Sequence, residues 1–410
     1  SVQLQPCDRC CKLSEHRVST VISNPAFFTM RSAVAKLAAK VVHYRGSVAR
    51  AGALALTGVA CYGLRRKYVA CESKGSSWAF CRDVNEGLKK IHDIEKKLLD
   101  LMPETSYSVR DIKVRVDPSK RCFLRRPESE FSIHTVVVGE EHLNSGKPPI
   151  VLVHGFMLGA AGFWKWLPLL AQHRTVYAID VIGMGGSGRP PFEAGSLTAE
   201  AAESLLVDPF QQWVEAMELN EFDLLGHSFG GFVCSAWASR YPEKIRSLGL
   251  LSPLLGFSDA RIDKFRGAGQ ELSWQAKAMR SALETAWSRH LTPQTIVRWV
   301  PGAKGWMERA STRRFQSMAS GVTQEEGRLL SEYVVATMDM PSSTESSATV
   351  CFEPFLRPTE VSGGTIKQRL STLRTPLYAI YGDRDWMDRA TIDEVPNCSI
   401  LELPKSGHHL

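Results

Sequence analysis

A short stretch near the middle of the chain combines a serine with two flanking glycines in a pattern that suits a nucleophile. Gly226-His227-Ser228-Phe229-Gly230 closes the apolar run FDLLGHS and leads into the helical pattern FVCSAWASRYP. Side chains two positions either side of the serine would collide with the neighbouring strand and helix, which explains the glycines. The turn holds the hydroxyl at a helix N-terminus, where developing negative charge is stabilised. We therefore predict that Ser228 is a nucleophile in acyl chemistry.

Two backbone N–H groups are needed to stabilise the oxyanion that forms when such a serine attacks a carbonyl group. One usually comes from the residue after the nucleophile, and the other from the loop after an earlier strand. The stretch VLVHGFMLGAAGFW supplies that loop. We predict that the N–H groups of Phe156 and Phe229 form the oxyanion hole, with Met157 as the alternative to Phe156. His154 is interpreted as a structural turn residue and not as a base.

The general base is expected after the last apolar run, because the partners of a serine in this setting follow in the order acid, then histidine. The final residues, LELPKSGHHL, place His408 directly after Gly407. His408 would accept the proton of Ser228. Its neighbour His409 is expected to point the other way along the backbone. His227 adjoins the nucleophile and is not expected to reach its oxygen with suitable geometry.

The stretch YGDRDWMD offers three carboxylates for the acid, Asp383, Asp385 and Asp388. In sites of this type the acid usually lies three residues after the glycine that ends the strand, which favours Asp385 over Asp383. The preceding apolar run continues as LLSPLLGF and has no carboxylate, which removes the other common position for the acid. We predict that Asp385 holds the imidazole of His408 in the required tautomer.

Six short apolar runs predict the elements that position these residues. The runs are PIVLVHG, TVYAIDVIG, FDLLGHS, SLGLLSP, PLYAIYGD and SILELP, and each ends in Gly, Asp, Ser or Pro. Continuous apolar strands of this kind are buried on both faces, and helical patterns lie between them. DIKVRV and SIHTVVVG predict two further strands that could pair as a hairpin. The fold class is therefore α/β, a mostly parallel sheet with helices on both faces.

The chain between the fourth and fifth of these runs is unusually long and carries its own helical patterns. A structureless loop of that length would be exceptional, so we predict a helical cap over the edge of the sheet, inserted before the strand that carries the acid. Its four tryptophans suit packing, an acyl pocket or a membrane interface. The predicted division is a basic leader at 1–75, an amphipathic helical lead-in at 76–108, the first part of the core at 109–255, the cap at 256–372 and the last part of the core at 373–410.

The charge of the chain is concentrated at its beginning. Residues 1–75 hold 12 Lys and Arg but 3 Asp and Glu, whereas the whole chain of 410 residues has a net charge of +7, so the remainder is slightly negative. The body therefore has no basic stripe that would favour nucleic-acid binding. The ten cysteines lack the spacing of a disulfide framework or a metal site, which predicts a reduced protein with unpaired thiols. No metal or organic cofactor is implied.

The leader has the composition of a targeting segment. No acidic residue occurs from Met30 to Cys71, where Arg and Lys recur among Ala, Ser, Val and Leu. This composition is typical of a mitochondrial or plastid transit peptide, the alternative being a basic disordered tail. The uncharged stretch AGALALTGVACYGL is shorter than the roughly 20 residues that a membrane-spanning helix needs. We also expect that translation starts at Met30 and that residues 1–29 are not native.

Taken together, the motifs resemble those of α/β-hydrolase-domain lipid hydrolases. The stretches that carry the resemblance are LVHGFMLGAAGFW, VYAIDVIGMGGSGRP, LLGHSFGGF with RYPEKIRSLGLLSP, and YGDRDWMD with SGHH. They span roughly residues 130–410, and they are similar to the subgroup of the lipid-droplet lipase coactivator, the N-acylphospholipid lipase and the mitochondrial cardiolipin-specific deacylase. The resemblance implies an α/β-hydrolase fold.

The resemblance also implies a serine hydrolase that cleaves acyl esters of glycerophospholipids through an acyl-enzyme on Ser228, with cardiolipin among the candidate substrates. The implied partners are a phospholipid or lysophospholipid and a membrane or lipid-droplet surface. The implied location, read with the leader, is mitochondrial, the alternative being the cytoplasm or the lipid-droplet surface. A lysophosphatidic acid acyltransferase and a non-enzymatic lipase coactivator are the rival functions. The coactivator carries asparagine where this chain has Ser228, which favours catalysis here.

The subgroup also carries an H-x-x-x-x-D motif tied to acyltransferase activity. Its histidine corresponds to His408, and its aspartate would lie beyond the last residue given. A further helix normally packs behind this histidine in the family. We therefore expect the sequence to be C-terminally truncated just after His408.

Overall fold

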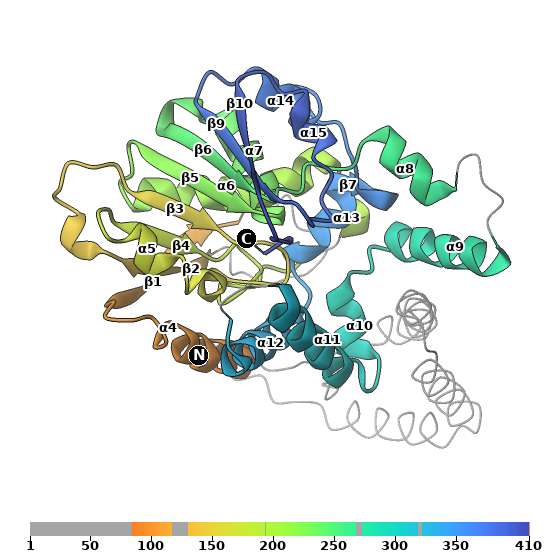
Figure 1. Ribbon diagram of the computed structural model, residues 1–410, viewed down its shortest axis with the longest axis horizontal. Helices are drawn as coiled ribbons and strands as arrows, with labels where there is room; N and C mark the ends of the chain where they lie inside the picture. The colour runs from red at the N-terminus through yellow and green to blue at the C-terminus, as the bar shows by residue number, and fades with distance from the viewer. Residues whose placement is uncertain (1–83, 117–129, 193, 268–272, 319–321, 410) are drawn as a thin grey trace, which may run out of the picture.

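An eight-stranded sheet forms the centre of the protein, in the order β1-β2-β4-β3-β5-β6-β9-β10 (Figure 1). The computed structural model describes residues 84–116, 130–192, 194–267, 273–318 and 322–409. The predictions made for 1–75, including the transit-like segment, AGALALTGVACYGL and a start at Met30, lie outside these residues. The strands are β1 Tyr107–Arg115, β2 Glu130–Val138, β3 Ile150–Val153, β4 Val176–Ile179, β5 Phe222–His227, β6 Ile245–Leu251, β9 Leu377–Gly382 and β10 Cys398–Leu403.

Most neighbouring strands of the sheet run parallel. β1 pairs antiparallel with β2, and β2 pairs antiparallel with β4. The pairs from β4 through β3, β5, β6 and β9 to β10 are all parallel. These six parallel strands correspond to the six apolar runs of the sequence, and the β1–β2 hairpin corresponds to DIKVRV and SIHTVVVG. The predicted α/β architecture is confirmed.

Helices cover both faces of the sheet, as Figure 1 shows. The helices outside the predicted cap are α4 Val84–Leu99, α5 Leu167–Leu170, α6 Ala199–Ala216, α7 Phe229–Arg240 and α15 Ala390–Asp393. The short 3-10 helices are η2 Glu140–His142, η3 Ala160–Phe163, η4 Ala194–Ser196, η5 Pro242–Lys244, η6 Thr344–Ser347 and η7 Pro354–Leu356.

The side chains of one strand alternate between the two layers of the core. Val151 and Val153 of β3 belong to the core cluster that contains Trp213 of α6 and Trp237 of α7. Leu152 points to the other cluster, which includes residues of α4 and α12. This period of two is what a strand buried on both faces requires.

The segment predicted as a cap is helical and lies beside the sheet (Figure 1). Its elements are α8 Asp259–Arg266, α9 Trp274–Ser288, α10 Pro293–Trp299, α11 Ala303–Met318, α12 Gln324–Asp339, α13 Ala348–Cys351, a two-stranded ribbon of β7 Phe352–Glu353 and β8 Arg357–Pro358, and α14 Ile366–Ser371. α12 packs against α4 and the sheet, and Gly87 of α4 lies so close to Met340 that a Cβ would be 2.4 Å from its Sδ. None of the helices within the described residues is long and apolar enough to span a membrane.

Candidate active site

Ser228 occupies a strained turn between β5 and α7. Its backbone has φ 54° and ψ −117°, a conformation that residues other than glycine rarely adopt. A Cβ on Gly226 would lie 2.5 Å from the carbonyl oxygen of Gly230. A Cβ on Gly230 would lie 2.3 Å from the carbonyl oxygen of Val153, at the end of β3. Both glycines are therefore required by close backbone approach, as the sequence pattern indicates.

Three predicted residues meet at this turn in a chain of hydrogen bonds. Nε2 of His408 lies 2.9 Å from Oγ of Ser228, and Nδ1 of His408 lies 3.0 Å from Oδ1 of Asp385. Ser228 comes from the end of β5, Asp385 from the loop after β9 and His408 from the loop after β10. The carboxyl ends of these parallel strands meet at one edge of the sheet, so side chains distant in sequence converge there. This geometry suits a neutral imidazole that donates through Nδ1 and accepts the serine proton at Nε2.

Asp385 is ionised in this environment. Burial alone would raise the pKa of its carboxyl group, but the hydrogen bond with His408, together with weaker contributions that include the N–H of Met387, holds that pKa below its ordinary value. The charged form is the one that can stabilise an imidazolium at His408. Electrostatics and geometry therefore favour the same assignment.

The two other candidate carboxylates bind elsewhere. Asp383 accepts the backbone N–H groups of Lys405 at 2.9 Å and Ser406 at 3.1 Å. Asp388 accepts the N–H and the hydroxyl of Ser258 at 2.8 and 2.6 Å. Asp383 thereby fixes the start of the loop that carries the histidine. Among the three candidates, Asp385 is the one hydrogen-bonded to that histidine.

The two predicted oxyanion donors lie on turns that meet at Ser228. Phe229 is the first residue of α7, so its N–H has no partner within the helix. A Cβ on Gly155 would lie 3.0 Å from Cβ of Ser228, which places the turn leading to Phe156 directly against the serine. The rings of Phe156 and Phe229 pack edge to face, with centroids 5.7 Å apart. The oxygen of Met157, the alternative donor residue, accepts a hydrogen bond of 2.8 Å from Thr337 of α12.

His154 has a structural environment, in agreement with its interpretation as a turn residue. Its Nδ1 donates to the carbonyl oxygen of Gly155 at 2.7 Å, and its Nε2 accepts the N–H of Val181 at 3.0 Å. Burial lowers the pKa of His154, so the ring is neutral and both nitrogens are engaged. It joins the loop after β3 to the loop after β4.

Three further aromatic side chains lie at the site, and one of them, Trp386, was not singled out from the sequence. The ring centroid of His408 lies 5.0 Å from that of His227 and 5.1 Å from that of Trp386. The ring of His409 lies 5.5 Å from His227 and 5.2 Å from Phe315 of α11. His409 therefore lies beside His227 and does not point away from the site. The chain bends at His408 after β10 has ended, so neighbouring side chains need not alternate.

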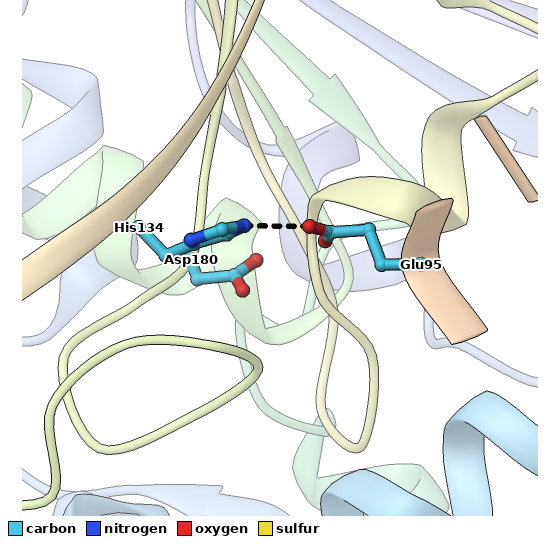
Figure 2. A group of neighbouring side chains, drawn as sticks. All are labelled: Glu95, His134 and Asp180. Atoms are coloured by element: carbon cyan, nitrogen blue, oxygen red, sulfur yellow. Dashed lines mark hydrogen bonds and ion pairs between the residues drawn. The ribbon is translucent and has the colours of Figure 1, made fainter. Parts of the chain in front are cut away.

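A separate group of buried side chains has ligand atoms at metal-binding separations. Atoms of Glu95, His134 and Asp180 lie within 4.8 Å of one another (Figure 2). Figure 2 shows the carboxylate of Glu95, from α4, directed at the ring of His134, from β2. Nε2 of His134 lies 2.6 Å from Glu95, and Nδ1 lies 3.1 Å from Asp111. Burial alone would lower the pKa of His134, but these two hydrogen bonds raise it to about 11.

These contacts identify the group as an ion-pair network. A ring with a proton on both nitrogens has no lone pair for a metal ion. Asp180 is also engaged, because its carboxylate accepts the N–H groups of Ala160 and Gly186 at 2.5 Å each. Ala160 begins η3 in the loop that contains Phe156. The network therefore joins α4 and β2 to the loop that carries a predicted oxyanion donor.

Comparisons with known proteins agree with this fold. The family model described as the alpha/beta hydrolase fold matches residues 148–397. A 1-acylglycerol-3-phosphate O-acyltransferase of Arabidopsis thaliana is 32% identical over 332 residues, 77% of this chain and 74% of that protein. A (lyso)-N-acylphosphatidylethanolamine lipase of Bos taurus is 29% identical over 69% of this chain and 79% of that protein. The crystal structure of carboxylesterase CesB from Bacillus subtilis, 15% identical, covers 79% of this chain and 93% of that chain with a TM-score of 0.50, which is a likeness of fold alone.

Proposed function

Because the chain belongs to the α/β hydrolase fold family, with lipid-acting enzymes among its relatives, we propose that it is a serine hydrolase that cleaves acyl esters of glycerophospholipids. The observation that carries the proposal is the chain of hydrogen bonds from Ser228 through His408 to Asp385. Ser228 and Asp385 each lie within hydrogen-bond distance of a ring nitrogen of His408, as nucleophilic acyl chemistry requires.

The first half of the reaction forms an ester between the substrate's acyl group and the protein. Nε2 of His408 takes the hydroxyl proton of Ser228 as Oγ attacks the carbonyl carbon. The carbonyl oxygen becomes an oxyanion, stabilised by the N–H groups of Phe156 and Phe229. The imidazolium, held by Asp385, then gives its proton to the departing lipid alkoxide. The acyl group remains on Ser228.

The second half releases the acyl group. A water molecule enters, His408 takes one of its protons, and the hydroxyl oxygen attacks the acyl carbon. The tetrahedral intermediate uses the same N–H donors as before. Its collapse returns the proton from His408 to Oγ of Ser228 and frees a fatty acid. One site thus serves both steps.

The substrate class rests on the relatives. The names of the two relatives described above, an acyltransferase that acts on 1-acylglycerol-3-phosphate and an N-acylphosphatidylethanolamine lipase, both concern glycerophospholipids. We take a phospholipid or lysophospholipid as the substrate, with cardiolipin as one candidate. Contact with a membrane or lipid-droplet surface belongs to the same proposal, as does a mitochondrial location, which rests on the basic leader. A fluorescent protein fused to residues 1–75 tests that location, and a uniform cytoplasmic signal would contradict it.

Acyl transfer to a lysophospholipid is the second candidate function, favoured by the similarity to the Arabidopsis acyltransferase. The acyl-enzyme would be the same, and a lysophospholipid hydroxyl would replace water in the second step. The experiment is product analysis after incubating the full chain and Ser228→Ala with vesicles of phosphatidylcholine, phosphatidylethanolamine or cardiolipin, and with lysophosphatidic acid plus acyl-CoA. Free fatty acid that depends on Ser228 supports hydrolysis, and phosphatidic acid that depends on it supports transfer. Products that are equal in both proteins would contradict both, leaving a coactivator.

A further inference from the structure

The imidazole next to the nucleophile makes a hydrogen bond that the reaction as described does not use. Nε2 of His227 lies 2.9 Å from the carbonyl oxygen of His408. A carbonyl oxygen can only accept, so Nε2 of His227 carries the proton. His227 is 7% exposed, which shields this bond from water. The side chain before the nucleophile therefore binds the backbone of the general base.

This contact is the main tether of His408 through its backbone. β10 ends at Leu403. The start of the following loop is held by Asp383, which accepts the N–H groups of Lys405 and Ser406. Among the described residues, the backbone of His408 makes one hydrogen bond, and its partner is the side chain of His227. The side chain of His227 therefore fixes the backbone of this loop, as backbone hydrogen bonds fix a strand in a sheet.

The other edge of His227 contacts the turn that leads to the oxyanion donor. A Cβ on Gly155 would lie 2.8 Å from Nδ1 of His227 and 3.0 Å from Cβ of Ser228. Phe156 follows this glycine directly. One imidazole thus lies between the backbone of His408 and the turn that places the N–H of Phe156.

The ring suits this position because it is neutral. Burial first, and then the neighbouring His408, lower the pKa of His227 to about 3. The groups that face it are His408, His409, His154 and Asp385, and the single carboxylate does not offset the burial. A second cation 5.0 Å from His408 would oppose the imidazolium that forms when Ser228 loses its proton. The neutral ring supplies a donor without that cost.

We propose that His227 is a positioning residue, which holds His408 and the Gly155 turn in register with Ser228. The proposal rests on the serine hydrolase function proposed above. It predicts that the N–H of residue 227 matters for the rate of acylation, while binding of the substrate depends on it little.

Two substitutions separate the donor from the volume of the side chain. His227→Leu fills the space without an N–H, and His227→Gln keeps an amide N–H at a similar reach. The full chain and both variants are treated with a fluorophosphonate, and the second-order rate of adduct formation on Ser228 is measured together with kcat and KM for a short-chain nitrophenyl ester. His142→Leu, on the 3-10 helix η2, in which no residue is buried, is the matched control.

We expect His227→Leu to lower the labelling rate and kcat by roughly 10- to 100-fold, with KM changed by less than about threefold, because displacing a reacting group by about 1 Å can cost about 100-fold in rate. His227→Gln should recover most of the lost rate. Equal losses in both variants, or a rate for His227→Leu within twofold of the unsubstituted chain, would overturn the proposal. Absence of labelling in the unsubstituted chain would instead contradict the proposed function.

A measurement on the unsubstituted chain tests the same claim without relying on a folded variant. Nitrogen-15 imidazole spectra report the tautomer of each histidine. His227 should remain the neutral Nε2–H tautomer from about pH 5 to about pH 9, where an ordinary histidine titrates. Protonation of His227 within that range, or an Nδ1–H tautomer, would overturn the proposal whether or not the chain hydrolyses lipids.

Discussion

The His134 network allows a stability prediction with a defined size and pH dependence. His134 is 1% exposed and Glu95 is 2% exposed, so neither charge has access to water. Replacing His134 by Gln keeps a polar side chain and removes the positive charge. Glu95 then remains buried without its counter-charge. Removing one member of a buried ion pair typically costs about 3 to 5 kcal/mol. We expect the free energy of unfolding to fall by that amount at about pH 7.

The sign of the pH dependence follows from the pKa of His134, which folding raises from 6.5 to about 11. A raised pKa contributes stability that is fully present below 6.5 and is lost as the pH rises towards 11. The difference between the unsubstituted chain and His134→Gln should therefore be largest below about pH 6.5 and shrink as the pH rises. It should decrease by at most about 1.4 kcal/mol for each pH unit.

The assay is urea denaturation followed by tryptophan fluorescence, at several pH values from neutral to alkaline. His142→Gln is the control, because its contact with Glu141 at 3.6 Å joins a half-buried ring to an exposed carboxylate and should contribute about 0 to 1 kcal/mol. A His134→Gln effect as small as the control would refute the reasoning. So would a difference that stays constant or grows as the pH rises.

Three further predictions follow from the site and its surroundings. Asp385→Asn should lower kcat by roughly ten-thousand-fold through the wrong histidine tautomer, and Asp383→Asn by less than about tenfold; equal losses in ester hydrolysis would contradict the choice of acid. Gly230→Ala should destabilise the chain by about 3 kcal/mol, because its Cβ would meet the carbonyl oxygen of Val153 in β3. Gly305→Ala, in α11, should instead stabilise the chain by about 0.5 to 1 kcal/mol. Thermal melts that give similar values for the two variants would count against the backbone argument. Treatment with a chelator should leave the melting temperature unchanged, since both nitrogens of His134 bind carboxylates, and a loss of stability that zinc restores would contradict the ion-pair interpretation.

The sheet and the nucleophile turn could be predicted because their signals are local. Each parallel strand is a short apolar run, and the glycines around Ser228 mark a turn whose steric reason lies within a few residues. The assignment of the family is confirmed for the same reason, since the motifs that carry it lie along most of the body. The expected domain boundaries and the start and end of the natural chain stay predictions.

Features made by distant segments that no sequence motif marks could not be predicted. Glu95, His134 and Asp180 come from α4, β2 and the loop after β4, and no spacing in the sequence links them. The packing of α4 against α12 likewise joins two helices that the sequence assigns to separate parts. The position of His409 beside His227 likewise depends on a bend at His408 that the sequence does not reveal.

The central claim is that Ser228, activated by His408, is the nucleophile. Its most direct test is the site of covalent labelling by a fluorophosphonate, mapped by mass spectrometry of peptides from the full chain. We predict a single adduct on the peptide that contains Ser228, lost in Ser228→Ala and strongly slowed in His408→Ala but not in His409→Ala. An adduct on any other residue, or labelling that persists in Ser228→Ala, would contradict the account.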